Sequence, residues 1–162
     1  MEDSAALAEK LREEGNKLAD FLSALGEGEW NAEVYTEGAT WTVRSILAHL
    51  MTAERSFLPL FVRVRRGGPG VPEDFSIDRY NARQQEKTRD QDPKSLLDAY
   101  RSTREEMIAL VQGFSAEELE KSGRHPFLGM ATLREMVKLV YIHNQTHYRD
   151  VRRALKGAQS SS

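Results

Sequence analysis

The stretch TWTVRSILAHLMTAERSFLPLFVRVRRGG, residues 40–68, decides the fold of this chain. Its apolar residues recur at spacings of three and four, which places them on one side of an amphipathic helix. Thr42 is a suitable N-cap, and the glycines at 67 and 68 end the pattern. Pro59 lies inside the pattern, where the missing N–H predicts a kink or the end of the regular part. The stretch therefore predicts a long helix that buries one face.

The same helical spacing occurs in three further stretches, over about residues 4–25, 93–113 and 132–155. Asp92 caps the second of them, and TLRE at Thr132 to Glu135 forms a capping box for the third. No convincing strand pattern competes with these helices. Four long helices with mostly short connections predict an all-α fold, namely an antiparallel four-helix bundle that is either up-down-up-down or contains one longer crossing.

The long connection after the second long helix opens with a Gly/Pro-rich segment and becomes helix-like from about Ser76. We therefore expect one extra short helix there, and its polar composition predicts a position across the end of the bundle. The sequence GAQSSS at residues 157–162 predicts a disordered tail. A single four-helix-bundle domain is thus expected over residues 1–156.

The composition excludes several classes of partner. The 162 residues include 23 basic and 25 acidic side chains, so the net charge is −2. Phosphate binding needs a concentrated basic surface, and the only dense basic cluster, at residues 63–68, is short, so no nucleic-acid partner is expected. The start of the chain does not resemble a secretory signal, and no segment approaches the ~20 apolar residues of a membrane span. These features predict a cytoplasmic protein without a membrane partner.

The chain contains no cysteine. Disulfides, thiolate metal sites and a cysteine nucleophile are therefore excluded. Any thiol chemistry would have to use a thiol that a cofactor or substrate brings in.

Three histidines stand on two helix faces that should turn toward the core. His143 and His147 lie four residues apart in YIHNQTHYRD, so their imidazoles share one face of the last helix, and His49 lies mid-helix among apolar residues of the second. One interpretation is that these are half-buried polar side chains that are hydrogen-bonded to their neighbours. The other is a metal site, because a divalent cation takes three buried lone pairs at once. His125, before a proline in a Gly-rich segment, is expected in a loop near the bundle end.

A site with three imidazoles and an open position is typical of catalytic rather than structural metal centres. Zinc suits three nitrogens best, and nickel, iron, cobalt and copper also accept imidazole. Asn144 stands where the zinc-protease helix motif needs a glutamate as general base, which argues against peptide hydrolysis. Glu54 lies off the face of His49 and is not counted as a ligand.

Three strings carry a family resemblance: WTVRSILAHLMTAE, DRYNARQ and HPFLGMATLREMVKLVYIHNQTHYRDV. In this order and spacing they resemble the DinB/YfiT-like superfamily of four-helix-bundle metalloenzymes, which is related to mycothiol-dependent maleylpyruvate isomerase. The resemblance implies a divalent metal, often zinc or nickel, bound by His49, His143 and His147, and a frequent homodimeric state. It also implies thiol-dependent transferase or isomerase activity that uses mycothiol, bacillithiol or glutathione.

The expected function is therefore that of a divalent-metal-binding protein that acts on a small molecule as a thiol transferase or isomerase, with an external low-molecular-weight thiol. A metal in an open three-histidine site would hold such a sulfur as thiolate at neutral pH. Two alternatives stay open: a non-catalytic metal-binding or helical interaction module, and a metal-dependent hydrolase that uses an activated water. Asn81, Tyr148 and Arg149 are the expected substrate contacts, with Arg149 suited to a carboxylate. No catalytic residue is assigned.

Overall fold

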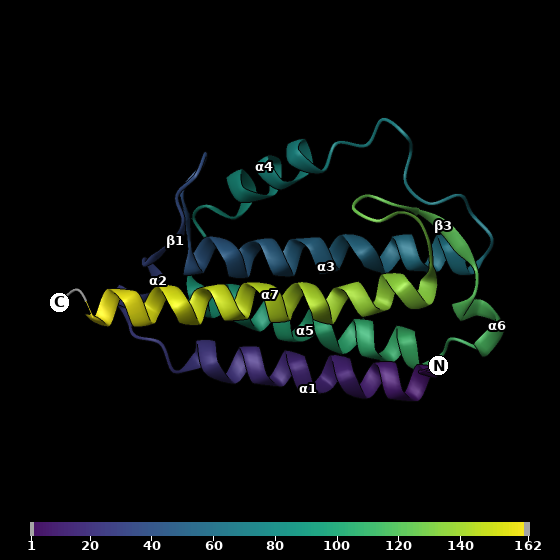
Figure 1. The fold of residues 1–162 in the computed structure, drawn as a ribbon, viewed down its shortest axis with the longest axis horizontal. Helices are drawn as coiled ribbons and strands as arrows, with labels where there is room; N and C mark the ends of the chain where they lie inside the picture. Colours follow the sequence, from purple (N-terminus) through teal and green to yellow (C-terminus); the bar gives the residue numbers. More distant parts are fainter. Residues whose placement is uncertain (1, 161–162) are drawn as a thin grey trace.

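The computed structural model describes residues 2–160 of the chain, and side chains up to residue 158. Within this part, four long helices form a bundle: α1 (Ser4–Ser23), α3 (Val43–Arg65), α5 (Pro93–Gln112) and α7 (Leu133–Ser160). Helices α1 and α3 each pack against both α5 and α7 (Figure 1). The predicted all-α four-helix bundle is confirmed.

The bundle contains the longer crossing and is not up-down-up-down. Helix α4 (Ile77–Thr88) carries the chain back along the side of α3, so that α3 and α5 run in the same direction (Figure 1). At one end, the guanidinium of Arg44 donates hydrogen bonds to the carbonyls of Arg89 (2.7 Å) and Gln91 (2.9 Å), just before α5 begins. At the other end, Arg65 donates to the carboxylate of Glu118 (2.7 Å), just after α5 ends.

Helix α4 is the extra short helix that the sequence predicted, but its expected position across the bundle end is wrong. It lies along α3, where the Tyr80 hydroxyl donates to the Thr52 carbonyl (3.1 Å) and the Gln85 amide donates to the Ser45 carbonyl (2.9 Å). Arg44 also satisfies carbonyls at the C-terminal end of α4 that have no partner within the helix. These polar contacts hold a polar helix against the bundle, and α4 therefore forms a wall beside α3.

The predicted helix starts are confirmed by their caps. The side chains of Thr42, Ser76 and Asp92 each accept a hydrogen bond from the backbone N–H three residues later. The carboxylate of Glu135 accepts from the backbone N–H of Thr132 (3.0 Å), and the Thr132 hydroxyl accepts from the N–H of Glu135 (3.1 Å), which is the predicted capping box.

Helix α3 does not end at Pro59 but continues to Arg65. A proline in a helix interior costs about 3 kcal/mol. The next two side chains, Leu60 and Phe61, are fully buried, and each such burial contributes about 1.5–3 kcal/mol. Packing of this part of α3 into the core therefore offsets the lost backbone hydrogen bond.

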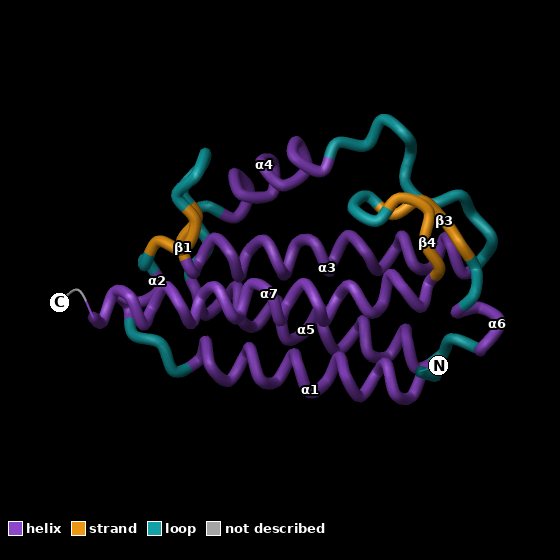
Figure 2. Tube along the Cα trace, in the orientation of Figure 1, coloured by secondary structure: helices purple, strands orange, loops and turns teal. Residues whose placement is uncertain are grey.

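Two short antiparallel hairpins were not predicted (Figure 2). Strands β1 (Glu33–Tyr35) and β2 (Trp41–Thr42) follow the short helix α2 (Glu27–Trp30). Strands β3 (Ser122–His125) and β4 (Gly129–Thr132) follow the short helix α6 (Ala116–Leu119). Strands of two to four residues are too short to show an alternating pattern. Each hairpin leads directly into a long helix, β2 into α3 and β4 into α7, and thus lies against the bundle.

Helix α7 runs to Ser160, whereas the sequence predicted its end near residue 155 and a disordered tail from residue 157. The structure describes residues 157–160 as the last turn of this helix, and the disordered tail stays a prediction. A single glycine such as Gly157 costs a helix only about 1 kcal/mol, which helix-favouring neighbours can offset. The prediction for residues 161 and 162 falls outside the described residues. None of the helices within residues 2–160 is long and apolar enough to cross a membrane.

The bundle core consists of two apolar clusters with a polar layer between them. One cluster includes Leu11, Phe61 and Met107, and the other includes Leu18, Leu47 and Leu96. The buried polar side chains that lie between these positions along the helices are His49, Thr52, Glu54, Thr103, Arg104 and Asn144. The candidate metal ligands belong to this layer, so they lie at mid-height of the bundle.

Candidate metal centre

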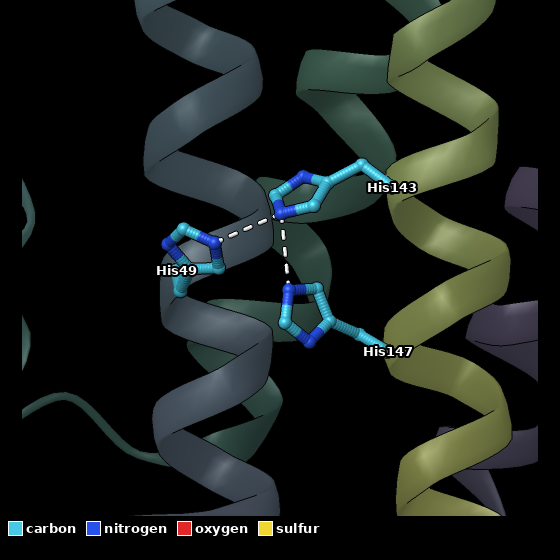
Figure 3. A group of neighbouring side chains, drawn as sticks. All are labelled: His49, His143 and His147. Atoms are coloured by element: carbon cyan, nitrogen blue, oxygen red, sulfur yellow. Dashed lines mark hydrogen bonds between the residues drawn. The ribbon is translucent and has the colours of Figure 1, made fainter. Parts of the chain in front are cut away.

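The three histidines that the sequence singled out converge at one point (Figure 3). His49 projects from the middle of α3, and His143 and His147 project toward it from successive turns of α7. The Nε2 atom of His143 lies 3.0 Å from Nε2 of His49 and 3.0 Å from Nε2 of His147. One ring nitrogen from each residue lies within 4.8 Å of the other two. The structure thus brings these three side chains together, in the geometry a shared cation would need.

Burial keeps the three imidazoles neutral. Burial, together with the neighbouring histidines, lowers the pKa of His49 to about 3 and that of His143 to about 3. Burial also lowers the pKa of His147, against the attraction of the Asp150 carboxylate. Each ring therefore has one N–H and one lone pair at neutral pH, which is the form that binds metals.

Tyr35 and Asp150 determine which nitrogen of His147 carries the hydrogen. The Tyr35 hydroxyl donates to Oδ2 of Asp150 (2.5 Å), and its oxygen lies 2.9 Å from Nδ1 of His147. Because the carboxylate takes the only hydroxyl hydrogen, Nδ1 of His147 must donate to Tyr35. Burial and Asp150 raise the pKa of Tyr35, so the hydroxyl stays protonated. The Nε2 lone pair of His147 is then directed toward His143, as in metal sites whose ligands are oriented by an outer hydrogen bond.

The arrangement fits a divalent cation. Nε2 of His147 directs a lone pair at Nε2 of His143, and Nε2 of His143 lies at hydrogen-bond distance from Nε2 of both other histidines, so one cation could replace the hydrogens shared between these atoms. Three neutral imidazole nitrogens are a ligand set for zinc or nickel. Among the described residues, the group contains histidines only and no carboxylate. These three residues could therefore hold the metal and leave further coordination positions open.

Asn144 and Glu54 belong to a buried hydrogen-bond network on the core side of α7. Arg104 donates to both carboxylate oxygens of Glu54 (2.8 and 2.7 Å) and to Oδ1 of Asn144 (2.7 Å). The Tyr100 hydroxyl donates to the same Asn144 oxygen. Both carboxylate oxygens of Glu54 are thus occupied by Arg104, and Asn144 links α7 to α5 between the two histidines. Trp41 packs at the start of α3, where its ring centroid lies 5.0 Å from that of His49 in an edge-to-face arrangement.

A cavity of about 270 Å³ opens beside the histidine cluster. His49 and His143 line it from the bundle, and Asn81 lines it from α4. Of the three expected substrate contacts, Asn81 is therefore brought to the cluster. Tyr148 and Arg149 instead line a second cavity of about 350 Å³ between α1 and α7, together with several basic residues and none of the three histidines.

Tyr35, Asp150 and His125 are site residues that the sequence interpretation missed or set aside. Asp150 follows His147 by three residues, a spacing that places both on one helix face, so this residue could have been found. Tyr35 belongs to a short strand whose contact with α7 no spacing reveals. His125 is not in a free loop but in β3, and its side chain lines the cavity beside the cluster.

These features define a helical-bundle protein with a buried three-histidine cluster beside a small-molecule-sized cavity. The chain belongs to the DinB superfamily, whose family model matches residues 8–151. No curated protein sequence matches the chain significantly.

Solved structures share the fold. YfiT from Bacillus subtilis, described as "a probable metal-dependent hydrolase with an unusual four-helix bundle topology", superposes with a TM-score of 0.79 at 17% identity, over 96% of this chain and 87% of that chain. The mycothiol-dependent maleylpyruvate isomerase superposes with a TM-score of 0.73 at 16% identity, over 93% of this chain and 63% of that chain. The colibactin self-resistance protein ClbS, solved in complex with double-stranded DNA, superposes with a TM-score of 0.73 at 15% identity, over 98% of this chain and 97% of that chain. At these identities the similarity establishes the fold alone.

Proposed function

We propose that this protein binds one divalent metal, zinc or nickel, through His49, His143 and His147. The observation that carries the proposal is the convergence of three Nε2 atoms, with the lone pair of His147 directed inward by Tyr35. A metal held there would supply a Lewis acid with open positions for a sulfur or oxygen ligand. The Tyr35–Asp150 pair would hold the His147 ring in its ligating tautomer, and Asn144 would fix the rotation of α7.

We further propose a transferase or isomerase that uses an external low-molecular-weight thiol such as bacillithiol, mycothiol or glutathione. The absence of cysteine supports an external sulfur source, and the cavity beside His49 and His143 offers room for a small molecule. In this proposal Asn81 contacts the substrate. Tyr148 and Arg149 would contact it only if the substrate reaches the second cavity between α1 and α7.

A metal-dependent hydrolase is the second candidate, because the described function of the structurally similar YfiT favours it. The histidine group contains no carboxylate, and the Asp150 carboxylate accepts the hydrogen bond of Tyr35. A hydrolase would therefore need its general base from the substrate or from a residue outside the group. This requirement makes the thiol-dependent reaction the first candidate.

Metal analysis of protein purified without a histidine tag tests the site. We expect about one zinc or nickel per chain, and loss of the metal in His143→Ala and His147→Ala. His125→Gln is the matched control, because it removes a buried histidine outside the cluster and should keep the metal. A parent protein that takes up no stoichiometric metal would rule out the proposal.

Thermal-shift titrations of the metal-loaded protein with the three thiols test the reaction class. The cognate thiol should raise the melting temperature, and this thiol should then be transferred to an electrophile in a conjugation assay. Hydrolysis of a test ester without any thiol would favour the hydrolase instead. Metal binding without response to thiols or esters would favour the non-catalytic module.

A further inference from the structure

His125 lies at the wall of the cavity beside the histidine cluster, but outside the cluster itself. Its side chain is buried, with the whole residue 1% exposed, and its ring centroid lies 5.0 Å from that of Phe57. It comes from β3, the hairpin that leads into α7. The metal proposal assigns it no role.

The hydrogen bonds of His125 establish its tautomer. Nδ1 accepts from the backbone N–H groups of Phe127 (3.0 Å) and Leu128 (3.2 Å), so this nitrogen carries the lone pair. Burial lowers the pKa of His125 to about 4, so the ring is neutral at pH 7 and its single hydrogen is on Nε2. The role of Nδ1 in the hairpin turn is thus explained, and Nε2–H is left as a donor.

That donor has no hydrogen-bond partner anywhere in the described part of the chain. A buried donor without a partner is unfavourable, and native proteins rarely keep one unless something else supplies the acceptor. A turn that needs only an acceptor could use the carbonyl oxygen of asparagine. Histidine at this position adds a second polar atom, which the hairpin does not use.

The rest of the cavity wall is largely apolar. Phe57, Ile77, Phe127 and Leu139 contribute to it from four different elements or loops. Among its polar side chains, the Tyr80 hydroxyl is bonded to the Thr52 carbonyl. A volume of about 270 Å³ is close to the lower end of small-molecule pockets. The polar lining also includes Ser56, Asp78 and Asn81, besides the histidines. The cavity therefore suits a largely apolar group of roughly one aromatic ring that carries few polar atoms.

We propose that His125 is a binding residue whose Nε2–H donates a hydrogen bond to a carbonyl or similar oxygen of an apolar, aromatic-sized ligand in this cavity. The proposal deepens the proposed function, because it names the substrate class of the same site. It rests on the proposed function only in one respect, namely that the ligand is then a substrate. Binding in the cavity can be measured with or without metal.

Two variants of His125 separate the turn from the cavity. Asparagine can keep an acceptor near the position of Nδ1, so His125→Asn should preserve the hairpin and lose the cavity donor. Glutamine can keep a donor near the position of Nε2, so His125→Gln should preserve the cavity donor and weaken the turn. A purely structural histidine would make His125→Gln the more damaging change for every measurement.

The probes are acetophenone and α-methylstyrene, which have the same shape but differ in a C=O against a C=CH₂ group. Titrations followed by NMR, on metal-free and metal-loaded protein, should show that the parent binds acetophenone about three- to tenfold more tightly, the range expected for one hydrogen bond. His125→Gln should retain this preference, and His125→Asn should lose it. The Nε2–H resonance of His125 should move on addition of acetophenone only.

Equal affinity of the parent for the two probes, or no binding of either up to its solubility limit, would overturn the proposal. So would a preference for acetophenone that His125→Asn retains. Failure of the metal proposal is distinguishable, because it would appear as absence of stoichiometric metal while the preference in metal-free protein persists.

Discussion

At the scale of single residues, the feature that matters most is the chain of hydrogen bonds from Asp150 through Tyr35 to His147. This chain ends at Nδ1 of His147, the ring nitrogen that does not face the cluster. By holding the hydrogen on Nδ1, it leaves the lone pair of Nε2 directed into the cluster. Such outer hydrogen bonds orient ligands and raise their basicity. Tyr35 would therefore contribute to the proposed metal centre without facing the cation.

Tyr35→Phe should lower metal affinity about 10- to 100-fold, because Nδ1–H of His147 loses its acceptor and the ring becomes free to rotate or change tautomer. Competition with a chromophoric chelator measures the change. Tyr148→Phe is the control, since Tyr148 packs against Phe21 and lines the other cavity. Equal affinities for the parent and Tyr35→Phe would show that the hydroxyl does not orient the ligand.

The pKa values of His49 and His143 predict how the metal-free protein responds to acid. Both are lowered by burial to about 3, below the value of 6.5 for an unperturbed histidine. Between these limits the unfolded chain binds more protons than the folded one. The free energy of unfolding that these neutral histidines contribute is fully present above about pH 6.5. It is lost as the pH falls toward 3, at about 1.4 kcal/mol per pH unit for each histidine.

Urea unfolding of metal-free protein should therefore show a midpoint that decreases from pH 7 to pH 5. His143→Gln removes one of the titrating groups, so its midpoint should decrease less steeply over the same range. A parent and variant with identical pH dependence would mean that His143 is not held neutral by burial.

At the scale of helices, the polar layer determines how closely α1 approaches α5. The guanidinium of Arg104 lies against Gly15 of α1 and donates to the Leu11 carbonyl (2.7 Å). A Cβ atom at position 15 would lie 2.8 Å from Nη1 of Arg104. Gly15 is thus the residue that lets a buried arginine reach Glu54 and Asn144, and through Asn144 the helix that carries two of the three histidines.

Gly15→Ala should destabilise the protein by about 1–3 kcal/mol, because the added methyl group displaces Arg104 from a fully packed layer. At an open helix position, replacing glycine by alanine stabilises the helix by about 1 kcal/mol. A loss of stability in Gly15→Ala would therefore report the contact with Arg104. Gly157→Ala is the control, since a Cβ there meets no atom within 4 Å. Urea unfolding that shows both substitutions to be stabilising would contradict the close packing of α1 on Arg104.

At the scale of the whole molecule, the resemblance to the DinB/YfiT-like superfamily implies a homodimer. Large apolar side chains are exposed at Phe127 (71%) and Met130 (66%) on the β3–β4 hairpin and at Ile142 on α7. Light scattering should give twice the chain mass of 18.4 kDa. A mass of one chain at micromolar concentration would contradict the homodimer.

Several features of the fold and site could be predicted from the sequence because each depends on local chemistry. The apolar spacing in residues 43–65 determines a buried helix face whatever it packs against. Thr42, Ser76 and Asp92 cap the turns that follow them through hydrogen bonds to residues three positions away. The spacing of His143 and His147 places them on one helix face for the same reason. His49 could be added only because its own helix had a recognisable core side.

Other features were decided only by the tertiary structure, because they depend on contacts between residues distant in the sequence. Tyr35 meets His147 and Asp150 across more than a hundred residues, and Arg104 joins three helices through Glu54, Leu11 and Asn144. The position of α4 along α3 placed Asn81 in the cavity of the histidine cluster, whereas the packing of α7 against α1 placed Arg149 in another cavity. By itself, the sequence determined which side chains were suited to a metal; the packing of distant helices decided which of them meet, because side-chain convergence is set by helix positions and rotations that no local pattern encodes.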